Sequence, residues 1–180
     1  MGRSPATQLA PGVWRIPTLG RSAVNSFAFV DADGSVTLVD CGLAKAPPRI
    51  VAGLAAIGKR PADVTRIVLT HVHADHVGGA AEMARTTGAT VAAHTADAGY
   101  AASGTIPLPD QSFLPARIFS RFGSEKFPAF QVAEPLTDGT VLDVAGGLRI
   151  VHTPGHSPGH VSLLHESSGV LITGDALFNV

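Results

Sequence analysis

A cluster of metal-binding residue types follows a short apolar run in the first half of the chain. The run Arg66–Leu69 is typical of a buried strand, and it leads directly into Thr-His-Val-His-Ala-Asp-His at residues 70–76. Side chains two apart in an extended segment point the same way, so His71 and His73 can converge on one ion. This stretch constrains the fold, because the rest of the chain must support it and supply further ligands.

Two more donors follow at once. Asp75 and His76 come where Ala74 and the Gly78-Gly79 pair let the chain turn, so both can face a second position beside the first. Neutral imidazole and carboxylate suit zinc, and also iron or manganese. The alternative is a solvated polar loop, which would not require this spacing. We predict a metal site with two neighbouring positions.

The bulk composition is that of an ordinary globular domain. The 180 residues fit one domain, 45% of them are hydrophobic, and the formal net charge is −1. This charge gives no electrostatic footprint for nucleic acid or for a membrane surface. Cys41 is the only cysteine, and the N-terminus lacks a long apolar segment. We expect a cytoplasmic protein that acts on a small molecule, and a homo-oligomer is compatible with the sequence.

Hairpins followed by interleaved strands and helices predict a mixed α/β layered architecture. Residues 1–12 are polar and rich in Pro and Gly, which indicates a loose arm. Helices are expected after Pro47-Pro48, over Gly79–Thr87 and over Thr95–Ala102. The expected strands are Val13–Ile16, Ser26–Val30, Val36–Val39, Arg66–Leu69, Thr90–Ala93, Val141–Val144, Leu148–His152, Val161–His165 and Val170–Thr173.

Residues 103–131 have a different character, because five of the eight phenylalanines lie there. One interpretation is a surface helix whose aromatic side packs on the core. The other is a lid or pocket-wall insertion over the metal site that shapes an apolar substrate pocket.

The His-X-His-X-Asp-His motif after a strand resembles the metallo-β-lactamase superfamily of metallohydrolases. The resemblance covers most of the chain and implies a four-layer αββα sandwich of mixed sheets. It also implies roles for two later residues. The histidine of the Thr153-Pro154-Gly155-His156 segment would complete the first metal site, and Asp175, after the strand Val170–Thr173, would bridge both metals.

Two further residues are expected to orient the ligands. Asp40 follows a strand and resembles an aspartate near the site in this superfamily, which suggests an acceptor that holds a ligand or the metal loop. His160 is expected to line the pocket or to hydrogen-bond nearby. For His94, His152 and His165 we expect packed or partly exposed side chains without a metal role.

The resemblance thus implies two Zn²⁺ ions per complete site, with iron or manganese as alternatives. The first ion would have His71, His73 and His156, and the second would have Asp75, His76 and the bridge Asp175. Two such ions lower the pKa of a shared water, and Asp75 is the candidate for assisting proton movement in catalysis.

The chain departs from the superfamily pattern at its end. The superfamily supplies one more histidine to the second metal after a further helix and strand, and this sequence stops at Val180. The domain is therefore expected to be C-terminally incomplete. A longer parent protein, a partner chain that lends the missing piece, or a reduced site would each account for this.

The predicted function is metal-dependent hydrolysis of an ester, thioester, lactone or similar bond, as in the glyoxalase II and lactonase branches that the loop pattern resembles. One alternative is a mononuclear iron enzyme similar to persulfide dioxygenases, with His71, His156 and Asp175 as two histidines and one carboxylate. Another is a non-catalytic binding module with a decayed site.

Overall fold

The computed structural model describes residues 4–20, 22–107 and 126–177, which form two facing sheets. The first sheet has seven strands in sequence order: β1 Thr7–Ala10, β2 Val13–Leu19, β3 Val24–Val30, β4 Val36–Val39, β5 Val64–Val68, β6 Thr90–His94 and β7 Glu134–Leu136. The second has the order β11-β10-β9-β8, with β8 Val141–Leu142, β9 Leu148–His152, β10 Val161–His165 and β11 Leu171–Ile172.

The first sheet changes direction at β4. Strands β1 to β4 are antiparallel, whereas β4, β5, β6 and β7 are parallel to one another. A parallel pair needs a crossover connection, which α1 (Pro47–Ala56) supplies between β4 and β5 and α3 (Ala80–Thr87) supplies between β5 and β6. The carboxyl ends of β4, β5 and β6 consequently meet at one edge of the sheet.

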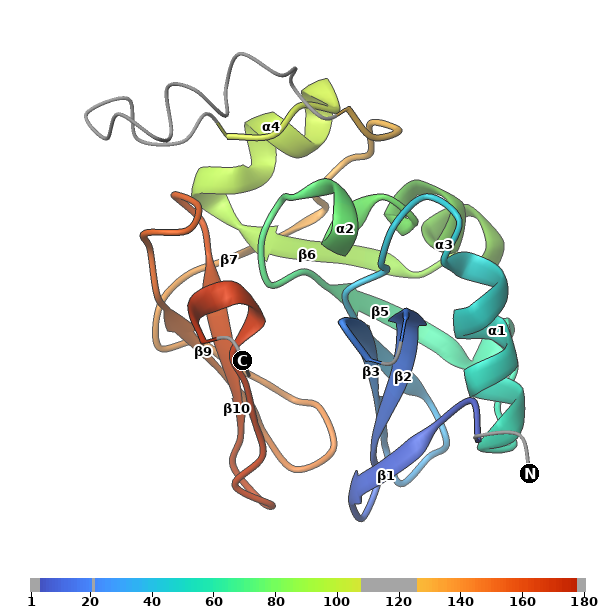
Figure 1. Cartoon of the computed structure of the whole chain (residues 1–180). Helices are drawn as coiled ribbons and strands as arrows, with labels where there is room; N and C mark the ends of the chain where they lie inside the picture. The colour runs from blue at the N-terminus through green and yellow to red at the C-terminus, as the bar shows by residue number, and fades with distance from the viewer. Residues whose placement is uncertain (1–3, 21, 108–125, 178–180) are drawn as a thin grey trace.

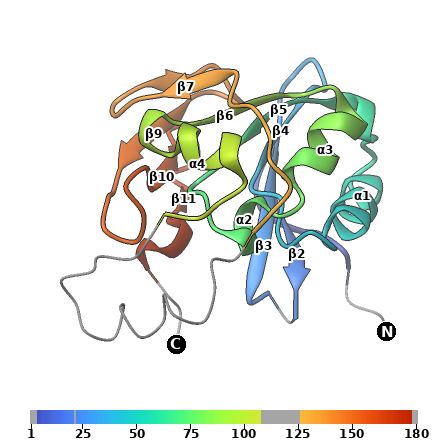
Figure 2. The ribbon, with the colours of Figure 1, turned by 90° about the horizontal axis from the view of Figure 1, so that it is seen from above.

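Two hydrophobic cores define the layers. Helices α1 and α3 lie against the outer face of the first sheet, and the second sheet lies against its inner face (Figures 1 and 2). The outer core includes Ile16, Ile50 and Met83, and the core between the sheets includes Phe29 and Ile150, all fully buried. The mixed α/β fold with mixed sheets is confirmed. The described residues supply three of the four expected layers: the helices α1 and α3 and the two sheets.

The expectation of a loose arm over residues 1–12 is wrong for Thr7–Ala10, which form a strand. Thr7 pairs with Arg15 and Gln8 with Trp14, so β1 is the edge strand of the first sheet. An edge strand needs no apolar alternation when both of its faces are exposed, and the side chains of Thr7, Gln8 and Leu9 are indeed exposed. Its polar composition therefore concealed it.

The segment 103–131 is described only at its two ends, and residues 108–125 lie outside the described residues. Helix α4 (Ala98–Ser103) precedes it, and Thr105 forms an isolated bridge with Lys126. Phe127 and Phe130 are buried in the outer core with Ala101, so the described ends pack on the core. No helix in the described part of the chain is long and apolar enough to cross a membrane.

Candidate metal centre

The candidate residues all follow the carboxyl ends of strands at one edge of the two sheets. Asp40 follows β4, and residues 70–76 follow β5. From the second sheet, residues 153–160 connect β9 to β10, and Asp175 lies in the short 3₁₀ helix Gly174–Ala176 after β11. The two sheets touch here, because the Val161 N–H donates to the carbonyl of Thr70 at 2.8 Å. Residues far apart in sequence thus meet at this seam.

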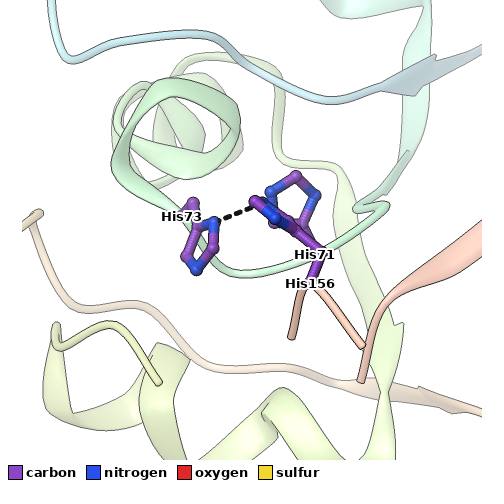
Figure 3. Close-up of side chains that lie close together, drawn as sticks. All are labelled: His71, His73 and His156. Carbon is purple, nitrogen blue, oxygen red and sulfur yellow. Dashed lines mark hydrogen bonds between the residues drawn. The ribbon is translucent and has the colours of Figure 1, made fainter. Parts of the chain in front are cut away.

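Three imidazoles gather at this edge. The candidate ligand atoms of His71, His73 and His156 all lie within 4.8 Å of one another. The Nδ1 atom of His73 lies 2.8 Å from Nε2 of His156, and the His71 ring packs edge-on against both (Figure 3). His73 has an extended backbone, as its alternation with His71 required. Three convergent imidazole nitrogens are a set that zinc favours.

A second group shares one of these histidines. His71, His76 and Asp175 also have ligand atoms within 4.8 Å of one another. Asp175 lies between the groups, with Oδ1 at 3.1 Å from Nε2 of His76 and Oδ2 at 3.4 Å from Nε2 of His156. One carboxylate therefore presents an oxygen to each group.

Asp75 lies at the border of the cluster. Its Oδ2 is 3.8 Å from Nε2 of His76, its side chain is 40% exposed, and it belongs to neither group of three. It begins the first turn of α2 (Ala74–Val77), a short helix where the sequence indicated only a turn. Asp75 also lines an open groove of about 1250 Å³ together with His76 and Asp175. No described residue of the segment 103–131 lines this groove.

Asp40 holds two parts of the metal loop. This carboxylate is buried and accepts hydrogen bonds from the Thr70 N–H, the Thr70 hydroxyl and Nδ1 of His76, each at 2.8 Å. Because Nδ1 of His76 is engaged by Asp40, the other ring nitrogen faces Asp175. Asp40 thus lies beside the metal loop and His76, and its orienting role stays a prediction.

His71 provides the test of whether a metal ion fits. The Thr70 hydroxyl donates to Asp40, so its oxygen can accept from Nδ1 of His71, 3.0 Å away. That contact makes Nδ1 the protonated nitrogen and leaves a lone pair on Nε2. Nε2 is buried and has no hydrogen-bond partner in the described structure, which is costly for a polar atom. A metal ion at the meeting point of the two groups would satisfy it.

The electrostatics of the cluster divide the histidines. Burial and the neighbouring His156 lower the pKa of His73 to about 4. Burial also opposes charge on His76, but the carboxylates of Asp40 and Asp175 prevail and raise the pKa of His76 to about 10. The hydrogen bond from His76 in turn lowers the pKa of Asp175. In the metal-free protein, His76 is therefore an imidazolium between two carboxylates, and a metal ion must displace its proton.

His160 supports the backbone at Asp175. Its ring is fully buried, its Nδ1 lies 2.8 Å from the hydroxyl of Thr153, and its Nε2 accepts from the Asp175 N–H at 3.0 Å. Gly174 is needed here, because it has a φ of 49° and an added Cβ would lie 2.7 Å from Nε2 of His160. His160 thus joins the Thr153 hydroxyl to the backbone of Asp175.

The remaining histidines pack as the sequence analysis expected. The rings of His94 and His152 stack with their centroids 4.0 Å apart, and buried His165 lies 2.7 Å from the carbonyl of Ala145 through Nε2. None of the three belongs to either group of candidate ligands.

Two supporting residues were not predicted. Thr70 links Asp40 to His71, and Asp97 accepts hydrogen bonds from both loops that carry the histidines. Thr70 lies two residues after the end of β5, and Asp97 lies three residues after the end of β6. The one available signal was a polar residue soon after a buried parallel strand, the position where ligand-binding residues gather in α/β folds.

Comparison with known proteins identifies the family and supports the fold. The family model for the metallo-beta-lactamase superfamily matches residues 19–180. A probable metallo-hydrolase of Bacillus subtilis, YybB, is 31% identical over 155 residues, which cover 86% of this chain and 62% of that protein. A hydroxyacylglutathione hydrolase of Cereibacter sphaeroides is 34% identical over 146 residues, covering 81% of this chain and 44% of that protein.

Solved structures agree. A metallo-beta-lactamase from Cronobacter sakazakii, a variant in its HARLDQ motif, superposes with a TM-score of 0.72 at 30% identity, covering 88% of this chain and 57% of that one. MIM-1 from Novosphingobium pentaromativorans gives a TM-score of 0.73 at 29% identity over 93% of this chain and 58% of that one. The chain thus spans about half of the length of these relatives. From its fold, its clustered histidines and these matches, the chain belongs to the metallo-beta-lactamase superfamily.

Proposed function

We propose that this chain carries the metal centre of a hydrolase that cleaves an ester, thioester, lactone or similar bond in a small molecule. The observation that carries the proposal is the pair of three-residue groups that share His71, with Asp175 facing both. Zinc is the proposed metal, because imidazole nitrogens predominate in the set.

The residues divide into ligands and supports. His71, His73 and His156 would hold the first ion, and His76, Asp75 and Asp175 the second, with Asp175 bridging. Asp40 and His160 act one step away: the first fixes the ring of His76, and the second fixes the backbone of Asp175. When bound, such ions act as Lewis acids that polarise a carbonyl and make water acidic enough to react near neutral pH.

Asp75 is the proposed proton carrier. Its carboxylate is 40% exposed and lines the groove, so it can exchange protons both with solvent and with a substrate that lies there. The buried Asp40 is committed to three hydrogen bonds and has no such access. The names of two relatives, a probable metallo-hydrolase and a hydroxyacylglutathione hydrolase, support acyl hydrolysis as the reaction class.

One observation favours a second candidate. The sequence predicted His71, His156 and Asp175 for this alternative, whereas the structure groups His71 and Asp175 with His76. Two histidines and one carboxylate are the set that non-haem iron oxygenases use. A single iron ion with oxygen uptake on a thiol substrate would be the corresponding activity. It would leave His73 and His156 of the first group without a role, so we rank it below hydrolysis.

Metal analysis and a substrate panel test the proposal. The purified protein is loaded with zinc or with iron, and metal is counted before the protein is assayed on thioesters, lactones, β-lactams and phosphodiesters. Two zinc ions per chain with turnover on one of these classes support the proposal. One iron ion with thiol-dependent oxygen uptake supports the alternative, and a protein that turns over nothing with any metal is a binding module.

A pair of histidine variants makes the assay specific. His156→Ala removes a proposed ligand and should abolish turnover and bind one zinc ion fewer. His152→Ala removes a histidine outside both groups and should keep the wild-type metal count. Equal metal counts in the two variants would contradict the assignment of His156.

A further inference from the structure

Asp97 is a buried carboxylate that joins the two loops of the metal centre. It lies at the end of the 3₁₀ helix Thr95–Asp97 after β6 and is fully buried. Its Oδ2 accepts from the Val72 N–H at 3.1 Å and from the Ser157 hydroxyl at 3.2 Å, and its Oδ1 accepts from the Gly159 N–H at 2.8 Å. One side chain therefore bonds to a loop of each sheet.

The bonded positions lie next to the first group of histidines. Val72 lies between His71 and His73, and Ser157 directly follows His156. A shift of Asp97 would move these two loops relative to each other, and with them the distance between the histidines of the first group. Asp40 instead bonds His76, a member of the second group, and reaches His71, which both groups share, through the Thr70 hydroxyl. The two carboxylates thus support different parts of the cluster.

The chain is shaped for this contact. An added Cβ at Gly159 would lie 2.4 Å from Cγ and 2.6 Å from Oδ1 of Asp97, closer than non-bonded atoms approach. Only glycine allows the backbone N–H to reach the carboxylate at this distance. Burial raises the pKa of Asp97, and the three donors oppose that rise. A buried carboxylate is costly unless it is fully bonded, so the arrangement must hold the two loops in one register.

We propose that Asp97 is a positioning residue that sets the spacing of His71 and His73 from His156 and so sets the metal affinity of the first group. The inference rests on the metal site of the proposed function, but it does not depend on the substrate. It assigns Asp97 no contact with substrate and no proton transfer.

Two variants weaken the same contact from opposite sides. Asp97→Asn keeps the size of the side chain but replaces one acceptor oxygen by a donor, and Gly159→Ala pushes the loop away while the carboxylate remains. Asp31→Asn is the control, because Asp31 accepts from the Ala145 N–H and so also links the two sheets. Asp31 follows β3 and lies near the first residue of β4, whereas Asp40 follows the last residue of β4.

The measurements are zinc affinity by competition with a chelating dye, the visible spectrum of the cobalt-loaded protein, and thermal unfolding of the metal-free protein. Asp97→Asn and Gly159→Ala should each weaken one of the two metal equivalents by about 10–100-fold, the range seen for residues that orient ligands. Both should also change the cobalt spectrum. The double variant should bind zinc nearly as well as the single variant with the lower affinity, because both substitutions disrupt the same contact. Asp31→Asn should unfold at a lower temperature with unchanged metal affinity.

Several results would overturn the inference. A lower unfolding temperature with wild-type zinc affinity in both variants would assign Asp97 a purely structural role, and so would failure of both to fold while Asp31→Asn folds. A wild-type protein that binds no zinc would overturn it as well. The wild-type protein could instead bind zinc and hydrolyse nothing, while the variants bind zinc more weakly. That result would contradict the proposed function and leave the role of Asp97 supported.

Discussion

Replacing Asp40 by asparagine removes one buried charge with little other change. The side chain of Asp40 is 2% exposed, and Oδ2 alone receives both the Thr70 hydroxyl and Nδ1 of His76. Asp40 has a φ of 56°, a left-handed conformation that asparagine tolerates nearly as well as aspartate. The backbone therefore has no reason to move, and the change tests the charge.

The structure fixes both the size of the effect and its dependence on pH. Breaking a buried ion pair by removing one partner costs about 3–5 kcal/mol. The pKa of His76 is raised to about 10, above the value of 6.5 in an unfolded chain, so its ion pairs stabilise the metal-free protein fully below pH 6.5. That stabilisation is lost as the pH rises through 10. At pH 10.5 His76 is mostly neutral, and the loss is then mainly that of hydrogen bonds from uncharged donors to the Asp40 carboxylate, worth about 1.5–3 kcal/mol.

Urea unfolding of the metal-free protein at pH 6 and at pH 10.5 measures the difference. We expect Asp40→Asn to lower the free energy of unfolding by about 3–5 kcal/mol at pH 6, and by a smaller amount, about 1.5–3 kcal/mol, at pH 10.5. Asp31→Asn should lower the free energy of unfolding by the same amount at both pH values, because the donor to the Asp31 carboxylate is a backbone N–H and not an ionisable group. A loss for Asp40→Asn below about 1 kcal/mol at pH 6, or one that does not change with pH, would refute the ion-pair reasoning.

Two further predictions concern the pH profile and the packing. The pKa of His73 is lowered to about 4, so the folded protein binds fewer protons than the unfolded chain between pH 4 and 6.5, and the stability of the metal-free protein should rise over that interval. His76 gives the opposite slope above pH 6.5, so the unfolding temperature should be highest near pH 6.5. Saturating zinc should move this maximum to higher pH. An unfolding temperature that does not vary with pH would contradict both pKa shifts. Gly53→Ala in α1 should cost about 1–3 kcal/mol, because the new Cβ would lie 2.5 Å from Cγ2 of Ile16. Gly99→Ala in α4, where nothing lies within 4 Å, should be neutral or stabilising, and equal unfolding midpoints for the two variants would count against this account of the packing.

The sequence alone was sufficient where the determinants are local. Alternation along an extended segment brought His71 and His73 to one side, and the structure shows their rings 4.7 Å apart. The strands expected at Ser26–Val30 and Val36–Val39 and the helix expected over Gly79–Thr87 are also confirmed, as the antiparallel pair β3 and β4 and as α3.

Contacts between residues far apart in the chain could not be predicted from the sequence alone. His156 and Asp175 were assigned only through a family resemblance, because their distance from the metal loop depends on how two sheets face each other. Asp97 was missed for the same reason, since its partners lie 25 and 62 positions away in the chain. The edge strand β1 escaped because exposed strands carry no apolar signal.

The place where the two sheets touch has a mechanical consequence. Across that seam, the first sheet contributes His71 and His73, and the second contributes His156 and Asp175. A metal ion bound by residues of both sheets would link two layers that otherwise adhere largely through hydrophobic side chains. Any ligand that binds the folded form alone adds to its stability in proportion to the logarithm of its concentration. The concentration of the free metal ion would then affect the stability of the folded protein as well as the occupancy of the site.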